Sequence, residues 1–419
     1  MVSGGTYGTE EIIHGAGYGH GILILLFLPV FWSLPTAFMI GELSSALPHE
    51  GGYYAWVRRG LGNFWGFQEA WISLAASIFD MAIYPTLFVF YLKQIAPWFS
   101  EGNHGVLAGL FVVAACTVLN LAGIRVVGIT SLWLFFLLSF PFAMVVIMTP
   151  LKAGAFAMPH GAVTGTGLGL LGGVLVAMWN YMGWDNLSTI AGEVEAPQRT
   201  YSRAMFGAVL LVVVSYLIPV GAVARTDIDP NRWTTGGWVD IGQIVGGETL
   251  AIAIAVAGVI GAIGSFGALM LSFTRLPLVM AEDGYLPRIF ARRDARTGAP
   301  WVAILVCAIL WAICFPLGFE KSLILDVLLT GLSILLEFWA LVALRIREPE
   351  LVRPFRVPGG VAGAVAIGVP PLALMIAAFV RNRTEHLGST NELVIGIGVI
   401  AAGIGVYFLS RMFRKNVQE

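Results

Sequence analysis

The sequence predicts an all-α protein that crosses a membrane many times, and three observations lead to this fold class. Only 12% of the 419 residues are charged, which is about half of the ~25% that is typical of soluble domains. Cutting the chain at its charged residues leaves many runs that reach or approach the ~20 residues a helix needs to cross a bilayer. These runs are continuously apolar and do not alternate, which excludes a transmembrane β-barrel.

The uncharged runs predict spans at residues 21–41, 105–124, 126–151, 161–184, 204–224, 249–274, 299–319, 357–380 and 393–410. Two further spans are expected at about 63–92 and 322–344, although each carries carboxylates within its apolar stretch. The chain is therefore expected to form eleven complete spans with very little soluble mass.

Cationic residues predict the orientation of the spans. If the C-terminal tail is cytoplasmic, 17 of the 24 Lys and Arg residues fall on the cytoplasmic side and 7 on the other. Such an excess in cytoplasmic loops predicts a cytoplasmic C-terminus in the cell membrane. Counting back, the run at 21–41 must begin outside, so residues 1–18 are interpreted as the second half of a broken span. Its first half is either missing from this sequence, with a natural start upstream of Met1, or was never translated.

Two helices are expected to break within the membrane. The first break is the Ser3-Gly4-Gly5 stretch, and the second runs from Asn180 to Gly183, where an apolar helix is interrupted before Asp185, a good helix cap. Irregular backbone at this depth is tolerated only where it lines a cavity or binds something. Paired breaks in corresponding halves of a chain point to an inverted-repeat transporter with its site at the midplane.

Several ordered motifs carry a resemblance to a known family: VSGG, GTEE, WSLPTAFMIGELSSALPHEGGYYAWV, LGNFWGFQEAWISLAASIFDMAIYP, MWNYMGWDNLSTIAGEVEAPQRTYSRAM, MAEDGYLPRIFARRDARTGAPWVAI and LLEFWALVALRIREPELVRPFRVPGG. With them the chain resembles the amino acid–polyamine–organocation superfamily, closest to its polyamine-uptake and cationic amino-acid branch. The resemblance implies a five-plus-five inverted repeat with two extra helices, with the first half of helix 1 missing here. Residues 1–346 would form the transport core, and residues 347–419 helices 11 and 12 with the tail.

The broken ends are the first candidate binding elements. Backbone amides at a half-helix N-terminus suit a carboxylate, and Ser3, Gly4 and Gly5 match a glycine motif that has this role in amino-acid-transporting relatives. The alternative is that these glycines only permit close packing of helices.

Carboxylates within the spans are the second candidates, because each costs roughly 2.5–3.5 kcal/mol at the centre of a membrane helix. Asp185 matches an acid that contacts the amine of cationic substrates in relatives, and capping a half-helix is its alternative role. Asp80 is a candidate for substrate contact or proton coupling, with a protonated structural acid as the alternative. Glu337 is interpreted as a buried structural or proton-coupling group, and Asp326 as a helix cap or interfacial charge.

Aromatic residues are expected to form the walls of the site. Trp179 matches a substrate-gating Trp of relatives, and the face of a Trp ring attracts cations. The remaining candidates for the walls and the broken segment are Tyr84, Asn180, Tyr181, Gly183, Trp184 and Phe266.

These features predict a secondary active permease for amino acids or polyamines, working by alternating access. Acids at mid-membrane without a cation at the same depth favour a positively charged cargo, with a neutral amino acid as the alternative if the acids are protonated. Proton coupling and exchange both stay open. A non-transporting sensor or inactive relative is the rival function. We expect no enzyme, cofactor, metal site or nucleic-acid partner, and the sequence does not predict the oligomeric state.

Overall fold

The computed structural model describes residues 5–153, 167–186, 188–189, 197–384 and 392–418, and the regular structure in these ranges is helical throughout. The all-α prediction is confirmed. The α-helices are α1 (Glu10–Phe31), α2 (Ser33–Ala46), α3 (Gly52–Leu61), α4 (Asn63–Ile95), α5 (His104–Leu121), α6 (Ile124–Ala153), α7 (Gly167–Asn180), α8 (Pro197–Val223), α9 (Gly237–Gly246), α10 (Glu248–Phe273), α11 (Arg275–Glu282), α12 (Trp301–Cys314), α13 (Phe319–Arg347), α14 (Gly360–Thr384) and α15 (Glu392–Gln418).

Each predicted span has a helical counterpart. Within the described residues, nine helical segments are long and apolar enough to cross a membrane. Two shorter apolar helices, Gly169–Asn180 and Trp301–Leu317, stand at the positions of the two other spans. The acid-bearing spans predicted at 63–92 and 322–344 are the uninterrupted helices α4 and α13.

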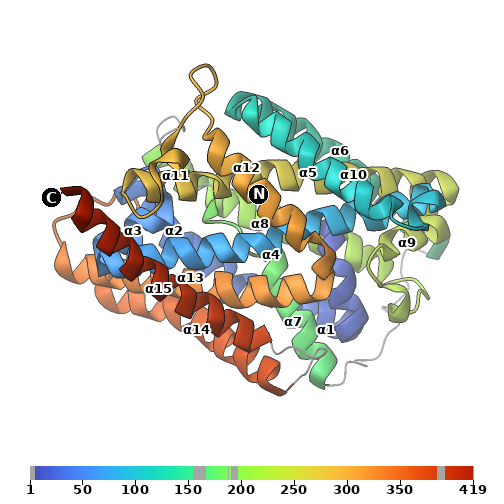
Figure 1. The fold of residues 1–419 in the computed structure, drawn as a ribbon. Coiled ribbons are helices and arrows are strands. Elements are labelled where there is room, and N and C mark those ends of the chain that lie inside the picture. Colours follow the sequence, from blue (N-terminus) through green and yellow to red (C-terminus); the bar gives the residue numbers. More distant parts are fainter. Residues whose placement is uncertain (1–4, 154–166, 187, 190–196, 385–391, 419) are drawn as a thin grey trace.

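The middle of the bundle is built on α4, which packs against both α10 and α13. In Figure 1, α14 and α15 lie along one edge of the molecule, while α5 and α6 lie along the opposite edge. α4 therefore carries its side chains into the interior, and 72% of its most apolar window is buried, against 17% for α15. A carboxylate on α4 consequently faces protein and not lipid.

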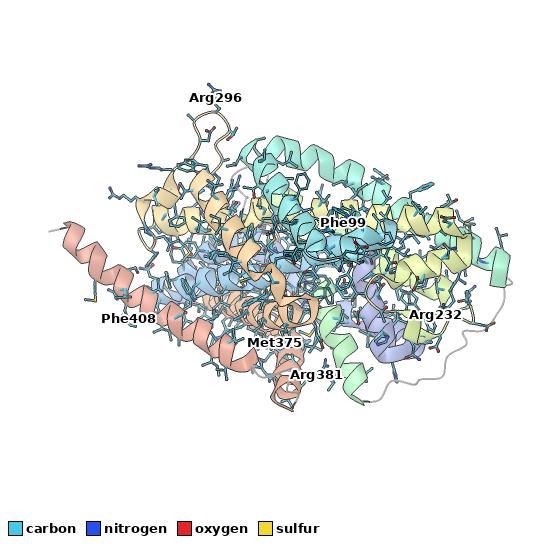
Figure 2. All side chains as sticks on the ribbon, turned by 45° about the vertical axis from the view of Figure 1, so that its right-hand side comes forward. Phe99, Arg232, Arg296, Met375, Arg381 and Phe408 are labelled. Atoms are coloured by element: carbon cyan, nitrogen blue, oxygen red, sulfur yellow. The ribbon has the colours of Figure 1, made fainter. Side chains whose placement is uncertain are left out.

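The two ends of the bundle differ in their connections. α3, α11 and the C-terminus lie at one end, and α9 lies at the other (Figure 1). Figure 2 places Arg296, in the loop before α12, and Arg232, in the short 3-10 helix η4 (Pro230–Arg232), toward opposite ends of the molecule. The central acids described below lie between these two ends.

Candidate functional site

The second predicted break is present. α7 ends at Asn180, and residues 181–185 are not helical. Gly183 has φ +93°, a conformation that a residue with a side chain adopts only with strain. Asp185 follows this turn, and its carbonyl accepts a hydrogen bond from the backbone N–H of Ser188 (2.8 Å). The chain thus leaves its helix just before the predicted substrate contact.

The first break is described from Gly5 onward. Gly5 has φ +59°, and the 3-10 helix η1 (Thr6–Thr9) leads from it into α1, which is kinked again at Gly17. Ser3 and Gly4 lie outside the described residues, so their predicted role in holding a carboxylate stays a prediction.

The two breaks lie against each other. The side-chain amide of Asn180 donates a hydrogen bond to the carbonyl of Gly8 (2.6 Å). A Cβ atom at Gly8 would overlap the Asn180 side chain, so only glycine permits this approach. The hydroxyl of Tyr216 donates to the Asn180 carbonyl (3.1 Å), which satisfies an acceptor at the end of α7. Asn180 is therefore the residue that joins the two breaks.

Tyr181 holds the second break to α1. Its hydroxyl donates to the carbonyl of Leu25 (2.9 Å). That carbonyl lacks its usual helical donor, because the residue four positions later is Pro29, which has no N–H. The indole N–H of Trp184 in turn donates to the Tyr181 carbonyl (2.6 Å). The polar atoms of both predicted wall residues thus bond to backbone, and their contact with a substrate stays a prediction.

Thr6 holds the first break in the same manner. Its hydroxyl donates to the carbonyl of Ser215 in α8 (3.3 Å). Pro219 stands four residues later and leaves this carbonyl without its helical donor as well. Each break is therefore fixed by a side-chain hydroxyl to a carbonyl that a proline has left open.

Asp80, Tyr84 and Trp179 form one hydrogen-bonded group. The indole N–H of Trp179 donates to Oδ1 of Asp80 (3.1 Å), and the Tyr84 hydroxyl donates to the same oxygen (3.2 Å). Asp80 is only 3% exposed. Three of the predicted site residues are thus brought together where side chains of α4 meet Trp179 at the end of α7.

A small cavity of about 20 Å³ lies beside this group and is lined by three carboxylates, those of Asp80, Asp185 and Asp326. The rest of its lining is formed by Tyr53, Ser73, Met182, Gly183, Asn186, Phe273, Thr330 and Ser333. The interpretation of Asp326 as a helix cap or interfacial charge was wrong. α13 begins at Phe319, so Asp326 lies about two turns inside the helix and is 3% exposed.

Two further acids lie beyond the cavity. Oε1 of Glu69 accepts hydrogen bonds from the hydroxyls of Ser73 (3.1 Å) and Ser333. Glu337 is completely buried, and neither of its carboxylate oxygens has a hydrogen-bond partner among the residues that the structure describes. The sequence analysis singled out Glu337 but missed Glu69. Their spacing from Asp80 and Asp326, eleven residues in both helices, is the signal that could have found Glu69.

The ion pairs of the described residues lie elsewhere. They join arginines to Glu42, Glu50, Glu282, Asp283 and Glu348, and none of them includes an acid of the central cavity or its two neighbours. The central acids are thus buried, and none of them forms an ion pair with a Lys or Arg residue that the structure describes.

A larger cavity of about 520 Å³ lies on the other side of Tyr84 and is lined by Gly5, Thr6 and mostly apolar residues of α6, α8 and α10. Because Tyr84 lines this cavity and also bonds to Asp80, it lies between the two spaces. Phe266 lines neither cavity, and its ring packs edge-on against Trp311 with 5.8 Å between the ring centroids. Its predicted role in closing the pocket stays a prediction.

Glu10 is a buried acid that the sequence analysis did not single out, and it is fully bonded. It accepts hydrogen bonds from the Tyr91 hydroxyl (2.8 Å) and from the backbone N–H groups of Gly236 (2.7 Å) and Trp238 (2.8 Å). The last two groups belong to the start of α9. Glu10 therefore fastens the segment after the first break to α9 at one end of the bundle.

A polar group at the other end joins α3 to the residue after α11. Arg58 pairs with Asp283, and the Tyr54 hydroxyl donates to the same carboxylate oxygen (2.5 Å). The hydrogen bond to Asp283 raises the pKa of Arg58 above its ordinary value. Burial, followed by the bond to Asp283, raises the pKa of Tyr54. Arg58 thus stays charged at any physiological pH.

Comparisons with known proteins agree with this architecture. A family model described as amino acid permease matches residues 1–405. The chain is 37% identical to "Polyamine transporter RMV1" of Arabidopsis thaliana, over 94% of this chain and 81% of the relative. It is 36% identical to "Polyamine transporter PUT1" of Oryza sativa subsp. japonica, over 99% of this chain and 77% of the relative. "Serine/threonine exchanger SteT" of Bacillus subtilis is 24% identical, over 90% of this chain and 85% of the relative.

Proposed function

The chain belongs to the amino acid permease family, and from this premise we propose that it transports di- and polyamines, binding an ammonium group among Asp80, Asp185 and Asp326. It is an integral membrane protein, with nine apolar helical segments in the described residues. Relatives at 36–37% identity carry the name polyamine transporter. The observation that supports this substrate class most strongly is the cavity lined by three buried carboxylates, none of which joins an ion pair among the described residues.

The charge balance of the cavity favours a cation. A buried carboxylate without a countercharge is unfavourable by several kcal/mol, and a substrate ammonium supplies that charge. In this proposal, Asp80 is the principal contact, because Trp179 and Tyr84 already hold its Oδ1 in place.

The separation of the two cavities favours an amine without a carboxylate. Gly5, whose break would offer backbone amides to a carboxylate, lines the large cavity, whereas the three acids line the small one. An amino acid would have to contact both sites at once across Tyr84. A polyamine needs the acids alone.

We propose transport by alternating access, without chemical conversion of the substrate. A cavity of about 20 Å³ holds roughly one water molecule, so a polyamine enters and leaves only when the surrounding helices move. With the C-terminus in the cytoplasm of the cell, the Arg58–Asp283 pair lies on the cytoplasmic side and separates when the site opens inward. Asp80 and Glu337 are the candidates for carrying a proton during the cycle, and exchange is the alternative mode.

Uptake of labelled spermidine into proteoliposomes tests this function. Asp80→Asn keeps the size of the side chain and removes its charge, and we expect uptake to fall by roughly a hundredfold, since unpairing a buried charged contact costs about 2–5 kcal/mol. Glu320→Gln, an exposed acid on α13, is the matched control and should leave uptake unchanged. Normal spermidine uptake by Asp80→Asn would contradict the proposed site.

A further inference from the structure

We infer that Glu69 and Glu337 form a second ammonium subsite, which binds the far amine of a long linear polyamine whose near amine lies at Asp80 and Asp326. The inference rests on the proposed function and extends it from one ammonium group to the length of the substrate.

The register of α4 against α13 brings these acids into two facing rows. The hydroxyls of Ser73 and Ser333 are 2.8 Å apart, and Ser333 also bonds to Glu69. Asp80 and Asp326 line the same cavity. Residue numbers therefore rise along α4 as they fall along α13, so the helices are antiparallel. Asp80 and Asp326 form one level, the two serines the next, and Glu69 and Glu337 the last.

The distance between the first and last levels fits a tetraamine. Glu69 and Asp80 are eleven residues apart, and so are Asp326 and Glu337, which at ~1.5 Å per residue is about 16 Å. An extended chain advances ~3.6 Å for every three bonds, and about thirteen bonds join the terminal nitrogens of spermine. Its span is thus about 16 Å as well, whereas putrescine, with about five such bonds, spans only about 6 Å.

Glu337 is the independent sign that a ligand group belongs here. It is 0% exposed, and within the described part of the chain both of its oxygens lack a hydrogen-bond partner. If it is ionised, it needs a cation, and if it is protonated, its O–H is a buried donor without an acceptor, so both states are unfavourable. An incoming ammonium satisfies the ionised state. One oxygen of Glu69 also lacks a partner, and its other oxygen is fixed by Ser73 and Ser333.

Tyr53 lies between the two levels. It lines the cavity with Asp80 and Asp185, and burial, followed by the nearby carboxylates of Asp185, Glu69 and Glu337, raises the pKa of its hydroxyl. It is 1% exposed, and its ring offers a face that attracts cations along the path. The carboxylates therefore form a row from the cavity to Glu337. None of them is paired with a basic residue in the ion pairs of the described residues.

Competition among amines of different length tests the subsite. Uptake of labelled putrescine into proteoliposomes is measured against unlabelled putrescine, spermidine and spermine. In the unmodified protein, we expect spermine to inhibit the uptake of labelled putrescine more strongly than the two shorter amines do. In Glu337→Gln, spermine should lose roughly tenfold of its potency, because one charged hydrogen bond is lost, while the potency of putrescine stays unchanged. Glu69→Gln should have the same pattern, and Glu320→Gln should leave all three potencies as they are.

The contrary outcomes separate this inference from the proposed function. Spermine potency that is unchanged in both Glu337→Gln and Glu69→Gln would overturn the subsite. An equal loss for all three amines would also overturn it, since it would assign these acids to the structure alone. Either result leaves putrescine uptake by the unmodified protein, and its dependence on Asp80, intact. A failure of the unmodified protein to take up any amine would instead contradict the proposed function.

Discussion

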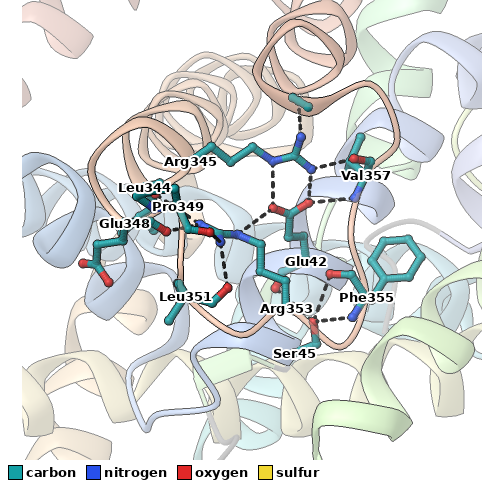
Figure 3. A network of polar contacts seen from close by, with 11 residues as sticks. Glu42, Ser45, Leu344, Arg345, Glu348, Pro349, Leu351, Arg353, Phe355 and Val357 are labelled. Atoms are coloured by element: carbon teal, nitrogen blue, oxygen red, sulfur yellow. Dashed lines mark hydrogen bonds and ion pairs between the residues drawn. The ribbon is translucent and has the colours of Figure 1, made fainter.

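Two buried carboxylates near α13, those of Glu42 and Glu337, differ in their hydrogen-bond and ion-pair partners. Glu42 of α2 accepts hydrogen bonds from Nε of Arg345 (2.8 Å) and the backbone N–H of Val357 (2.7 Å), and it pairs with Arg353 (3.2 Å) (Figure 3). Glu337 stands on α13 about two turns before Arg345, and its oxygens accept no hydrogen bond from any described residue.

The difference assigns the two acids to different tasks. The two arginines around Glu42 also donate to backbone carbonyls, Arg345 to Val357 and Arg353 to Leu351, so the group fastens the segment between α13 and α14 to α2. Its charges are complete without any ligand. In the function proposed above, the charges near Asp80 and Glu337 are completed by a cationic substrate. On this proposal, Glu42 holds the fold together, whereas Asp80 and Glu337 bind the substrate.

The largest expected effect is on stability, at Glu42. Glu42→Gln leaves Arg345 and Arg353 buried without a countercharge, and we expect a loss of about 3–5 kcal/mol. Thermal unfolding of the detergent-purified protein measures it. Glu337→Gln is the matched comparison and should unfold at the same temperature or higher, because it removes a carboxylate that has no partner. Equal destabilisation by the two variants would contradict the different roles assigned to Glu42 and Glu337.

The next effect concerns the hydrogen bonds that Asp80 accepts. Trp179→Phe keeps an aromatic ring and removes the hydrogen bond to Oδ1, which for a charged acceptor contributes about 1.5–3 kcal/mol. We expect spermidine affinity to fall by roughly tenfold or more. Trp311→Phe is the control, since the buried indole N–H of Trp311 has no partner. A similar fall in both variants would show that ring packing, and not the hydrogen bond, matters.

A smaller effect is expected at a neutral buried bond. Tyr181→Phe leaves the Leu25 carbonyl without a donor, which should cost about 1 kcal/mol of stability. Pro29→Ala supplies the missing helical N–H, so in that background Tyr181→Phe should cost clearly less. The melting temperatures of the four proteins of this cycle measure the coupling. Additive losses would contradict the role assigned to the proline.

The smallest effect is expected at an exposed pair. The hydrogen bond from Arg59 lowers the pKa of Glu348 below its ordinary value. The stability from this pair is therefore present above pH ~4.3, the ordinary Glu value, and is lost as the pH falls through the lowered pKa. Glu348→Gln should cost about 0–1 kcal/mol at pH 7. Melting temperatures that still differ well below that pKa would contradict this origin.

The sequence predicted the elements of this molecule better than their contacts. Charge-free runs are sufficient to locate spans, and a Gly and Asn interruption is sufficient to locate the end of α7 at Asn180. The hydrogen bond between Asp80 and Trp179 depends on how the whole bundle places the side chains of α4 near the end of α7, which no local pattern encodes. Asp326 was misplaced because it was judged by its distance from the start of a run, whereas its depth is set by the helix that begins at Phe319.

Glu69 was missed for a related reason. It stands near the start of its span, where acids commonly lie at the membrane surface, and only the contact with Ser333 shows that it is buried. Its relation to Glu337 emerges when α4 and α13 are considered together, because the two helices carry acids at the same spacing in opposite directions.

The melting temperature of the purified protein, measured with and without spermidine, tests most directly whether the buried acids bind a cation. We expect saturating spermidine to raise the melting temperature, by the equivalent of about 2.7 kcal/mol at a hundred times its Kd, and the rise to vanish in the Asp80→Asn, Asp185→Asn double variant. An uncharged diol of the same length should have no effect. Stabilisation by serine but not by spermidine, or a spermidine effect that survives in the double variant, would contradict the account.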